Sequence, residues 1–204
     1  MSMPTRGFIG RRPPAEVADR LPPGQHRTDD FPVLSLGPTP MVNLDTWKFE
    51  ITNGPRPLAT WTWAEFDALP RTSLRKDIHC VTKWSKFDTD WEGVLIDDLL
   101  AISGITPPTA FLLAKSYDGY DTNVPVADVI GGKGMIATRY AGAPLEAEHG
   151  GPARLLVPHL YFWKSAKWVK ALRFTARDEA GFWELRGYHM YGDPWREQRY
   201  TGDQ

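Results

Sequence analysis

The segment from His149 to Trp168 reads HGGPARLLVPHLYFWKSAKW, and it joins a strand-like apolar run to glycines and cations. Arg154 begins the apolar run, a placement that can fix a guanidinium near a buried anion. In the turn KSAK (164–167), backbone N–H groups, a hydroxyl and lysine can converge on a phosphate. Paired glycines after His149 let the backbone approach a ligand closely. These residues indicate a strand beside a site for one phosphorylated cofactor, and the alternative is a solvated strand edge with basic side chains.

Strand-length runs lie on both sides of this segment. Trp47–Thr52 (WKFEIT) alternates apolar and polar residues as a strand does, and Asn53–Gly54 forms its turn. Other strand-length apolar or alternating runs are AFLLAKSY (110–117), KGMIATRYA (133–141), ARLLVP (153–158), ALRFTAR (171–177) and GFWELRGY (181–188). The chain therefore has mostly β structure.

The expected helices are short. Thr62 and Glu65 have the spacing of a capping box, which predicts a helix that ends at Pro70. A second helix is expected over 94–103 and is stopped by Gly104. PVADVI (125–130) predicts one helical turn, and GGKG (131–134) lacks the spacing of a nucleotide-binding loop and predicts a plain turn. The fold class is α+β, with a mixed sheet, short helices and long loops.

Composition limits the class of protein. The 204 residues suffice for one domain with a substantial core, expected over 21–204, after a mobile tail over 1–20. Residues 21–40, rich in proline and glycine, are expected to form an extended strap around the domain. The net charge of −1 gives no pull toward nucleic acid or a membrane, and no apolar run is long enough to span a bilayer. Arg11–Arg12 precedes no apolar signal core, so the expected location is cytoplasmic.

Cys80 is the only cysteine of the chain and lies in KDIHCVTKWSKFDTDWEG (76–93). Three roles compete for it: a buried filler, a nucleophile, or the sole protein ligand of a metal held mainly by an organic cofactor. His79 is a poor base for a nucleophile, because neighbours in an extended segment point to opposite faces. The histidines show no tight metal spacing, so a zinc site is weakly supported.

The two segments together resemble the molybdopterin-binding domain of the sulfite oxidase family. The residues that carry the resemblance are CVTKWS (80–85), WEGVLIDDLL, DGYDTNVPVADV and HGGPARLLVPHLYFWKSAKWVKALRF, in this order. The likeness extends over nearly the whole chain, and it is greatest to a small bacterial branch that includes the catalytic subunit of methionine-sulfoxide reductase. It implies an oxidoreductase with molybdenum and molybdopterin, and one compact phosphate site favours the pterin without an added nucleotide.

The resemblance also implies a set of site residues. In that family one cysteine thiolate binds molybdenum, and Cys80 matches its position. His149 and Arg154 match residues against the pterin and its phosphate, and Ser165, Ala166 and Lys167 match the phosphate-binding turn. Ser116 lies where the bacterial branch has a hydroxyl residue near the cofactor. Gln25 and His26 are substitutes for an early pterin-contact segment that departs from the branch pattern. Lys83 is the nearest cation that could hold an anionic or dipolar substrate, and the alternative is a surface lysine.

Three functions follow as hypotheses. The first is oxygen-atom transfer to or from a small oxo-compound, with electrons exchanged with a separate partner, because no haem domain or immunoglobulin-like domain is recognised in the chain. The second is a carrier module that holds molybdopterin without turnover, and the third is a zinc hydrolase that uses Cys80 with histidines. The C-terminal residues 188–200 are expected to be a packed strap, and a docking face is the alternative.

Overall fold

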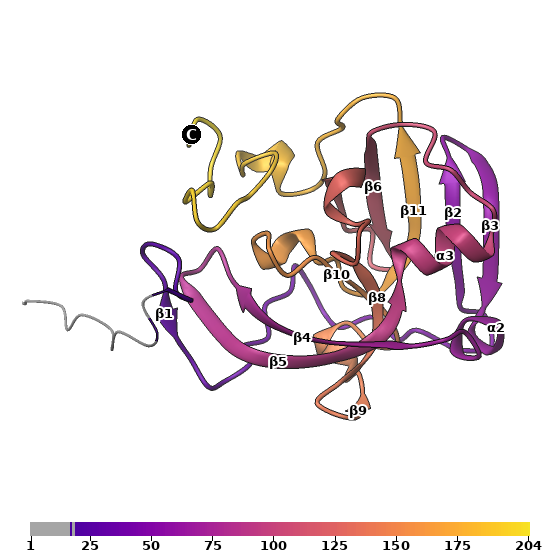
Figure 1. Ribbon diagram of the computed structural model, residues 1–204, viewed down its shortest axis with the longest axis horizontal. Coiled ribbons are helices and arrows are strands. Elements are labelled where there is room, and N and C mark those ends of the chain that lie inside the picture. The colour runs from indigo at the N-terminus through magenta and orange to yellow at the C-terminus, as the bar shows by residue number, and fades with distance from the viewer. Residues whose placement is uncertain (1–16, 18) are drawn as a thin grey trace, which may run out of the picture.

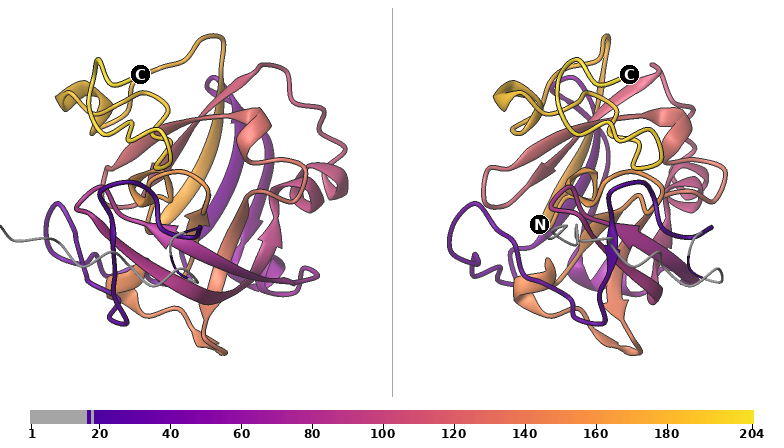
Figure 2. Two further views of the ribbon diagram at one scale, coloured as in Figure 1. Left: turned by 60° about the vertical axis from the view of Figure 1, so that its left-hand side comes forward. Right: turned by 90° about the vertical axis from the view of Figure 1, so that its left-hand side faces the viewer.

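The computed structural model describes residues 17 and 19–204, which build two β-sheets joined by short helices and long loops (Figures 1 and 2). Most of the expected N-terminal tail lies outside the described residues. Arg20, at its end, forms ion pairs with Asp77 (2.6 Å) and Asp88 (2.9 Å). The strap therefore begins at a fixed point on the domain.

The first sheet has five strands in the order β3-β2-β11-β6-β7. Its members are β2 (Lys48–Asn53), β3 (Arg56–Thr62), β6 (Phe111–Ser116), β7 (Asp121–Pro125) and β11 (Val169–Thr175). The expected turn at Asn53–Gly54 joins β2 to β3. Strand β11 runs parallel to β2 and antiparallel to β6, so the sheet is mixed, as predicted.

The second sheet has six strands in the path β1-β5-β8-β10, with β4 paired to β5 and β9 to β8. Its members are β1 (His26–Arg27), β4 (Thr72–His79), β5 (Trp84–Leu95), β8 (Met135–Tyr140), β9 (Ala143–Pro144) and β10 (Arg154–Leu156). Strands β4 and β5 form the long antiparallel pair of Figure 1, and the turn between them carries Cys80.

The expected helices are present. Helix α2 (Trp63–Asp67) has the capping box, because the Glu65 N–H donates to the Thr62 hydroxyl and the Thr62 N–H donates to the Glu65 carboxylate. Helix α3 (Ile96–Ile102) ends before Gly104, whose φ of +62° is left-handed. The short 3₁₀ helices are η1 (Val126–Asp128), η2 (Ala147–His149), η3 (Phe162–Lys164) and η4 (Glu184–Arg186). No helix among the described residues is long and apolar enough to cross a membrane.

The prediction of a strand over 181–188 is wrong. These residues contain η4, and their only ladder contact within the described part of the chain is an isolated bridge between Tyr188 and Tyr200. The Arg186 N–H instead donates to the Trp183 carbonyl (2.9 Å), and Leu185, an apolar residue of the pattern, is 73% exposed. Local turn bonds therefore take the place of a sheet ladder, and the apolar residues of this segment do not share one buried face.

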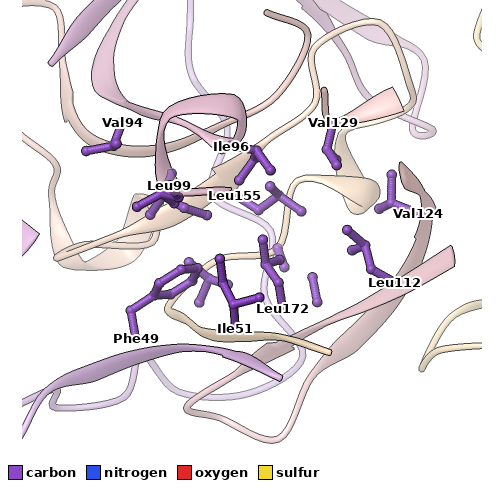
Figure 3. Packing of buried hydrophobic residues seen from close by; sticks show 14 of the residues in the cluster. Phe49, Ile51, Val94, Ile96, Leu99, Leu112, Val124, Val129, Leu155 and Leu172 are labelled. Carbon is purple, nitrogen blue, oxygen red and sulfur yellow. The ribbon is translucent and has the colours of Figure 1, made fainter. Parts of the chain in front are cut away.

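The main core lies between the two sheets (Figure 3). Phe49 and Ile51 of β2 and Leu172 of β11 face Leu155 of β10, and α3 adds Leu99. A second buried cluster includes Ile78, Trp84, Trp91, Met135, Leu156 and Phe162, together with Cys80. The thiol therefore belongs to a packed aromatic region that supports the site.

Candidate active site

A cavity of about 310 Å³ brings together five parts of the chain that are far apart in sequence. They are residues 31–36 of the strap, residues 80–84 after β4, residues 149–168, and Trp183 and Tyr188 near the C-terminus, and a fifth part, Asp118 and Tyr120 between β6 and β7, also lines it. Six of the predicted site residues line it: Cys80, His149, Arg154, Ser165, Ala166 and Lys167. Two sequence segments separated by nearly seventy residues thus share one site, as the resemblance implies.

Cys80 occupies the first position of a tight turn. Its N–H donates to the Trp84 carbonyl (2.8 Å), and its carbonyl accepts from the Lys83 N–H (3.0 Å). The side chain is 7% exposed. Burial raises the pKa of the Cys80 thiol, and a contact of 3.1 Å with the Thr82 hydroxyl acts in the opposite direction. The thiol is thus protonated until a cation binds it, which would remove the proton.

Gln25 and His26 form hydrogen bonds to the backbone of this turn. The Gln25 side-chain amide donates to the Cys80 carbonyl (3.0 Å), and the His26 N–H donates to the Lys83 carbonyl (2.8 Å). Neither residue is among those that line the cavity. The structure therefore gives them contact with the backbone around Cys80, and their predicted contact with a cofactor stays a prediction.

His79 is directed away from the thiol, as the extended geometry predicts. Its Nδ1 atom lies 2.8 Å from the Ser85 hydroxyl. Burial lowers the pKa of His79 to about 4, against a smaller opposing effect of Asp77. A neutral ring bonded to a serine is poorly placed to activate the neighbouring Cys80.

Arg154 is a buried cation without a carboxylate partner in the described part of the chain. Its guanidinium donates to the carbonyls of His149 (2.8 Å) and Ser165 (2.7 Å), while its Nε atom has no partner. The centroid of the Phe162 ring lies 4.1 Å from the guanidinium carbon. Burial lowers the pKa of Arg154. Since an uncompensated buried charge is costly, this arrangement favours an anion in the cavity.

Lys167 adds a second cation at the same end of the cavity. Its ammonium donates to the carbonyls of Leu34 (2.9 Å) and Glu148 (2.6 Å) and to the Ser35 hydroxyl (3.1 Å). Burial, with a smaller contribution from Arg154, lowers the pKa of Lys167 to about 8. Lys167 therefore ties the strap to the turn and adds positive charge to the anion site.

Gly150 makes the approach of these two cations possible. Its φ is +108°, and an added Cβ would lie 3.0 Å from the Lys167 Cα atom and 3.1 Å from the Arg154 Cβ atom. Glycine is therefore the residue that fits this position.

Ser165 and Ala166 line the cavity close to Arg154. The Ser165 hydroxyl accepts from the Val157 N–H (2.9 Å), so it is engaged in holding the turn to the strand that follows Arg154. The Ala166 carbonyl accepts from the Leu155 N–H (2.9 Å). Both residues line the cavity, and their backbone is fixed on both sides by these bonds.

His149 lies flat against Phe31 of the strap, with ring centroids 4.0 Å apart and an angle of 11° between the planes. Its buried Nδ1 atom has no hydrogen-bond partner among the residues that the structure describes. Burial, Lys167 and Arg154 together lower the pKa of His149, which favours the neutral ring. A neutral imidazole with a free nitrogen can bond to a polar ligand.

Three residues considered in the sequence lie outside the cavity. Ser116 is buried at the end of β6 with an unpartnered hydroxyl, but it is not a lining residue. Lys83 is exposed, with a left-handed φ of +75°, on the outer side of the Cys80 turn. Lys164, the first lysine of KSAK, does not converge on a phosphate site, because its fully buried ammonium is paired with Glu184 at 2.6 Å.

The aromatic wall of the cavity was not predicted as part of the site. It consists of Trp163, Trp183 and Tyr188, and the Tyr188 ring centroid lies 5.3 Å from that of Trp163 and 4.8 Å from that of Trp183. The sequence did hold a signal for this wall, because the aromatic residues of 188–200 predicted a strap packed against the domain. Only the folded chain shows that residues just before and within that segment complete the cavity.

Comparison with known proteins decides the family. Residues 36–183 match the model of the oxidoreductase molybdopterin binding domain. The chain belongs to this family.

The relatives agree with this assignment. The chain is 37% identical over 197 residues to the uncharacterized oxidoreductase YuiH of Bacillus subtilis (strain 168), with 96% of this chain and 100% of YuiH covered. It is 27% identical over 151 residues to YedZ1 of Azospira oryzae, a candidate protein-methionine-sulfoxide reductase subunit, with 74% and 57% covered. It is 24% identical over 185 residues to mitochondrial sulfite oxidase of Drosophila melanogaster, with 78% and 32% covered.

Among solved structures, the sulfane dehydrogenase SoxCD of Paracoccus pantotrophus superposes with a TM-score of 0.59 at 18% identity, with 87% of this chain and 56% of that chain covered. This likeness supports the sulfite oxidase-type fold. The chain is thus a molybdopterin-dependent oxidoreductase, and its family implies a molybdenum cofactor.

The residues present fit such a group. The cavity offers a soft sulfur atom at Cys80 and, at Arg154, a buried cation with an unpartnered Nε atom. By contrast, the compact trio of possible metal ligands found among the described residues is Glu146, Glu148 and His149, which does not include Cys80. The geometry therefore favours a thiolate ligand to a cofactor-held metal over a cysteine–histidine zinc site.

Proposed function

We propose that this oxidoreductase transfers an oxygen atom to or from a small oxo-compound, such as a sulfoxide or a sulfite-like oxyanion. The observation that carries the proposal is the meeting of Cys80 and the Arg154–Lys167 anion site in one cavity. When bound, the molybdenum cofactor would supply two-electron redox chemistry and the exchangeable oxygen. The chain's own residues supply binding, orientation and exclusion of water.

In this proposal the two ends of the cavity bind different parts of the cofactor, its phosphate and its metal. Arg154 and Lys167 would hold the phosphate of the pterin, because both are partly desolvated cations that lack a carboxylate partner among the described residues. The plain pterin, without a nucleotide, suits this single anion site. Cys80 would give its thiolate to the metal, with its backbone fixed by Gln25.

The aromatic wall favours catalysis over a carrier role. A carrier needs only a grip on the cofactor, whereas Trp183 and Tyr188 line the cavity from a separate chain segment. Aromatic rings exclude water and present apolar faces to a small substrate. Lys83 lies outside this wall, so we assign no substrate contact to it. The cytoplasmic location expected from the sequence stays a prediction.

The test uses protein expressed with molybdate. Molybdenum content, pterin fluorescence after oxidative release, and dye-coupled turnover of sulfoxides and sulfite are measured for wild type, Cys80→Ser and the control Ser73→Ala, which lies at an exposed position of β4. We expect wild type and Ser73→Ala to hold metal and pterin and to turn over a substrate. Cys80→Ser should keep the wild-type circular dichroism spectrum and much of the pterin but lose turnover.

Three results would contradict the proposal. Full activity of Cys80→Ser would remove the thiolate from the mechanism. Wild-type protein with metal and pterin but no turnover across the panel would favour the carrier module instead. Zinc at unit stoichiometry without pterin would favour a hydrolase.

A further inference from the structure

The outward face of the five-stranded sheet carries a hollow lined by lysines. On β2, the buried residues Phe49 and Ile51 alternate with Lys48, Glu50 and Thr52, which point away from the core. In the neighbouring strands, Ala171 lies between Glu50 and Lys115 in register. Because the central side chain is only a methyl group, the face has a depression of about 400 Å³ there.

A β-bulge adds a third lysine to this face. The register between β11 and β6 shifts between Val169 and Ala171, and the residue between them is Lys170. A bulge re-aims the side chain that it inserts, and Lys170 lines the same hollow. Its ammonium lies 5.7 Å from the centroid of the Tyr117 ring. Lys48, Lys115 and Lys170 together form what we call the lysine face.

The lysine face has a net positive charge, although the net charge of the whole chain is slightly negative. Three lysines share the hollow with one carboxylate, Glu50, while the whole chain has a net charge of −1. None of the three forms an ion pair within the described part of the chain. Asp121 is the cross-strand neighbour of Lys115 and offsets part of its charge. Lys48 and Lys170 are therefore the least compensated cations of this surface.

A short path of bonds joins the lysine face to the cofactor cavity. Tyr117, at the floor of the hollow, donates its backbone N–H to the Trp168 carbonyl (2.9 Å), and Trp168 lines the cavity. The Tyr117 hydroxyl donates to the Lys48 carbonyl (2.8 Å) and accepts from the Lys48 N–H (2.7 Å). From Lys170, the chain reaches Trp168 in two residues. One hydrogen bond thus connects a residue that lines the hollow to a residue that lines the cavity, in the layer formed by the ends of β6 and β11.

We propose that the lysine face docks a small acidic electron-transfer protein, which exchanges electrons with the cofactor through this layer. The inference rests on the proposed oxygen-atom transfer. In the reductive direction an oxo-substrate takes up two electrons and two protons to give the reduced product and water, so a one-electron partner docks twice in each turnover. Complementary charge steers such encounters and makes them depend on salt.

The experiment compares two double variants that change the net charge equally. Lys48→Glu/Lys170→Glu reverses the lysine face, and Lys76→Glu/Lys133→Glu reverses two exposed lysines elsewhere. The probe is a plant-type ferredoxin, a small acidic one-electron protein. Its binding to holoenzyme is measured by titration at low and high salt. Turnover is measured with reduced ferredoxin and, separately, with a zwitterionic viologen dye as electron donor.

We expect the lysine-face variant to lose about tenfold or more of ferredoxin binding and ferredoxin-driven kcat/KM at low salt, with dye-driven turnover unchanged. The control variant should behave as wild type. Equal effects of both variants on ferredoxin, or no binding of ferredoxin to wild type while the dye drives turnover, would overturn the docking surface. Absence of dye-driven turnover in wild type would instead count against the proposed function.

Discussion

Replacing Lys164 by Met should destabilise the protein severely. The Lys164 ammonium and the Glu184 carboxylate are both fully buried and lie 2.6 Å apart. The ammonium also donates to the Asn123 side-chain oxygen (2.6 Å) and to the Met190 carbonyl (2.7 Å). Methionine has a similar volume but no charge, so it would leave Glu184 buried without its counter-ion.

The magnitude follows from this uncompensated charge. Removing one partner of a buried ion pair typically costs about 3–5 kcal/mol. Glu184 would keep its bonds from Trp163 (2.8 Å) and Thr122 (3.0 Å), which places the expected loss at the lower end, about 3 kcal/mol. Since domains are stable by roughly 5–15 kcal/mol, the variant would lose a large share of its stability.

Urea unfolding of the cofactor-free protein, followed by tryptophan fluorescence, measures the change. The double variant Lys164→Met/Glu184→Leu removes both charges and should be more stable than Lys164→Met alone, because no buried charge remains. A loss below about 1 kcal/mol in Lys164→Met, or a double variant as unstable as the sum of the singles, would refute the reasoning.

Two further predictions concern the anion site. Gly150→Ala should weaken cofactor retention on gel filtration and lower the melting temperature more than Gly131→Ala, because both glycines have positive φ but only at Gly150 does a Cβ meet neighbouring atoms; equal effects would show that crowding at Gly150 is unimportant. Cofactor affinity, measured by dissociation during dialysis, should be constant below about pH 8 and fall above it. The bound anion prefers the protonated ammonium of Lys167, whose pKa is about 8 before an anion binds. In Lys167→Arg the fall should move to higher pH, and an unchanged profile would exclude Lys167 as its cause.

Much of the fold follows from local patterns in the chain. Alternation in Trp47–Thr52 and the Thr62–Glu65 capping box depend on near neighbours, and both appear as predicted. The failure at 181–188 has a tertiary cause, because Trp183 and Tyr188 complete a cavity built with distant segments, while the backbone between them forms η4 instead of pairing with a strand. No local rule separates that alternation from the alternation of a strand.

The site, like the fold, was predicted in part, and the features that depend on distant residues were missed. The resemblance placed Cys80, His149, Arg154 and Lys167 in one site, and the structure brings these residues to one cavity. The resemblance matched Lys167 alone, whereas the residue types of the KSAK turn did not separate Lys164 from Lys167, because the decisive partner of Lys164, Glu184, lies twenty residues away in sequence. The exposure of Lys83 depends on a left-handed residue in the turn, which its sequence context does not signal.

The assembly of the cavity from five distant chain segments has a thermodynamic consequence. In the proposed site no single segment supplies the thiol, the cations and the aromatic wall together, so we expect the cofactor to bind the native state and not the unfolded chain. By mass action, each tenfold excess of cofactor over its dissociation constant adds about 1.4 kcal/mol to the unfolding free energy. A shortage of pterin is therefore expected to lower the resistance of the protein to heat and to proteolysis.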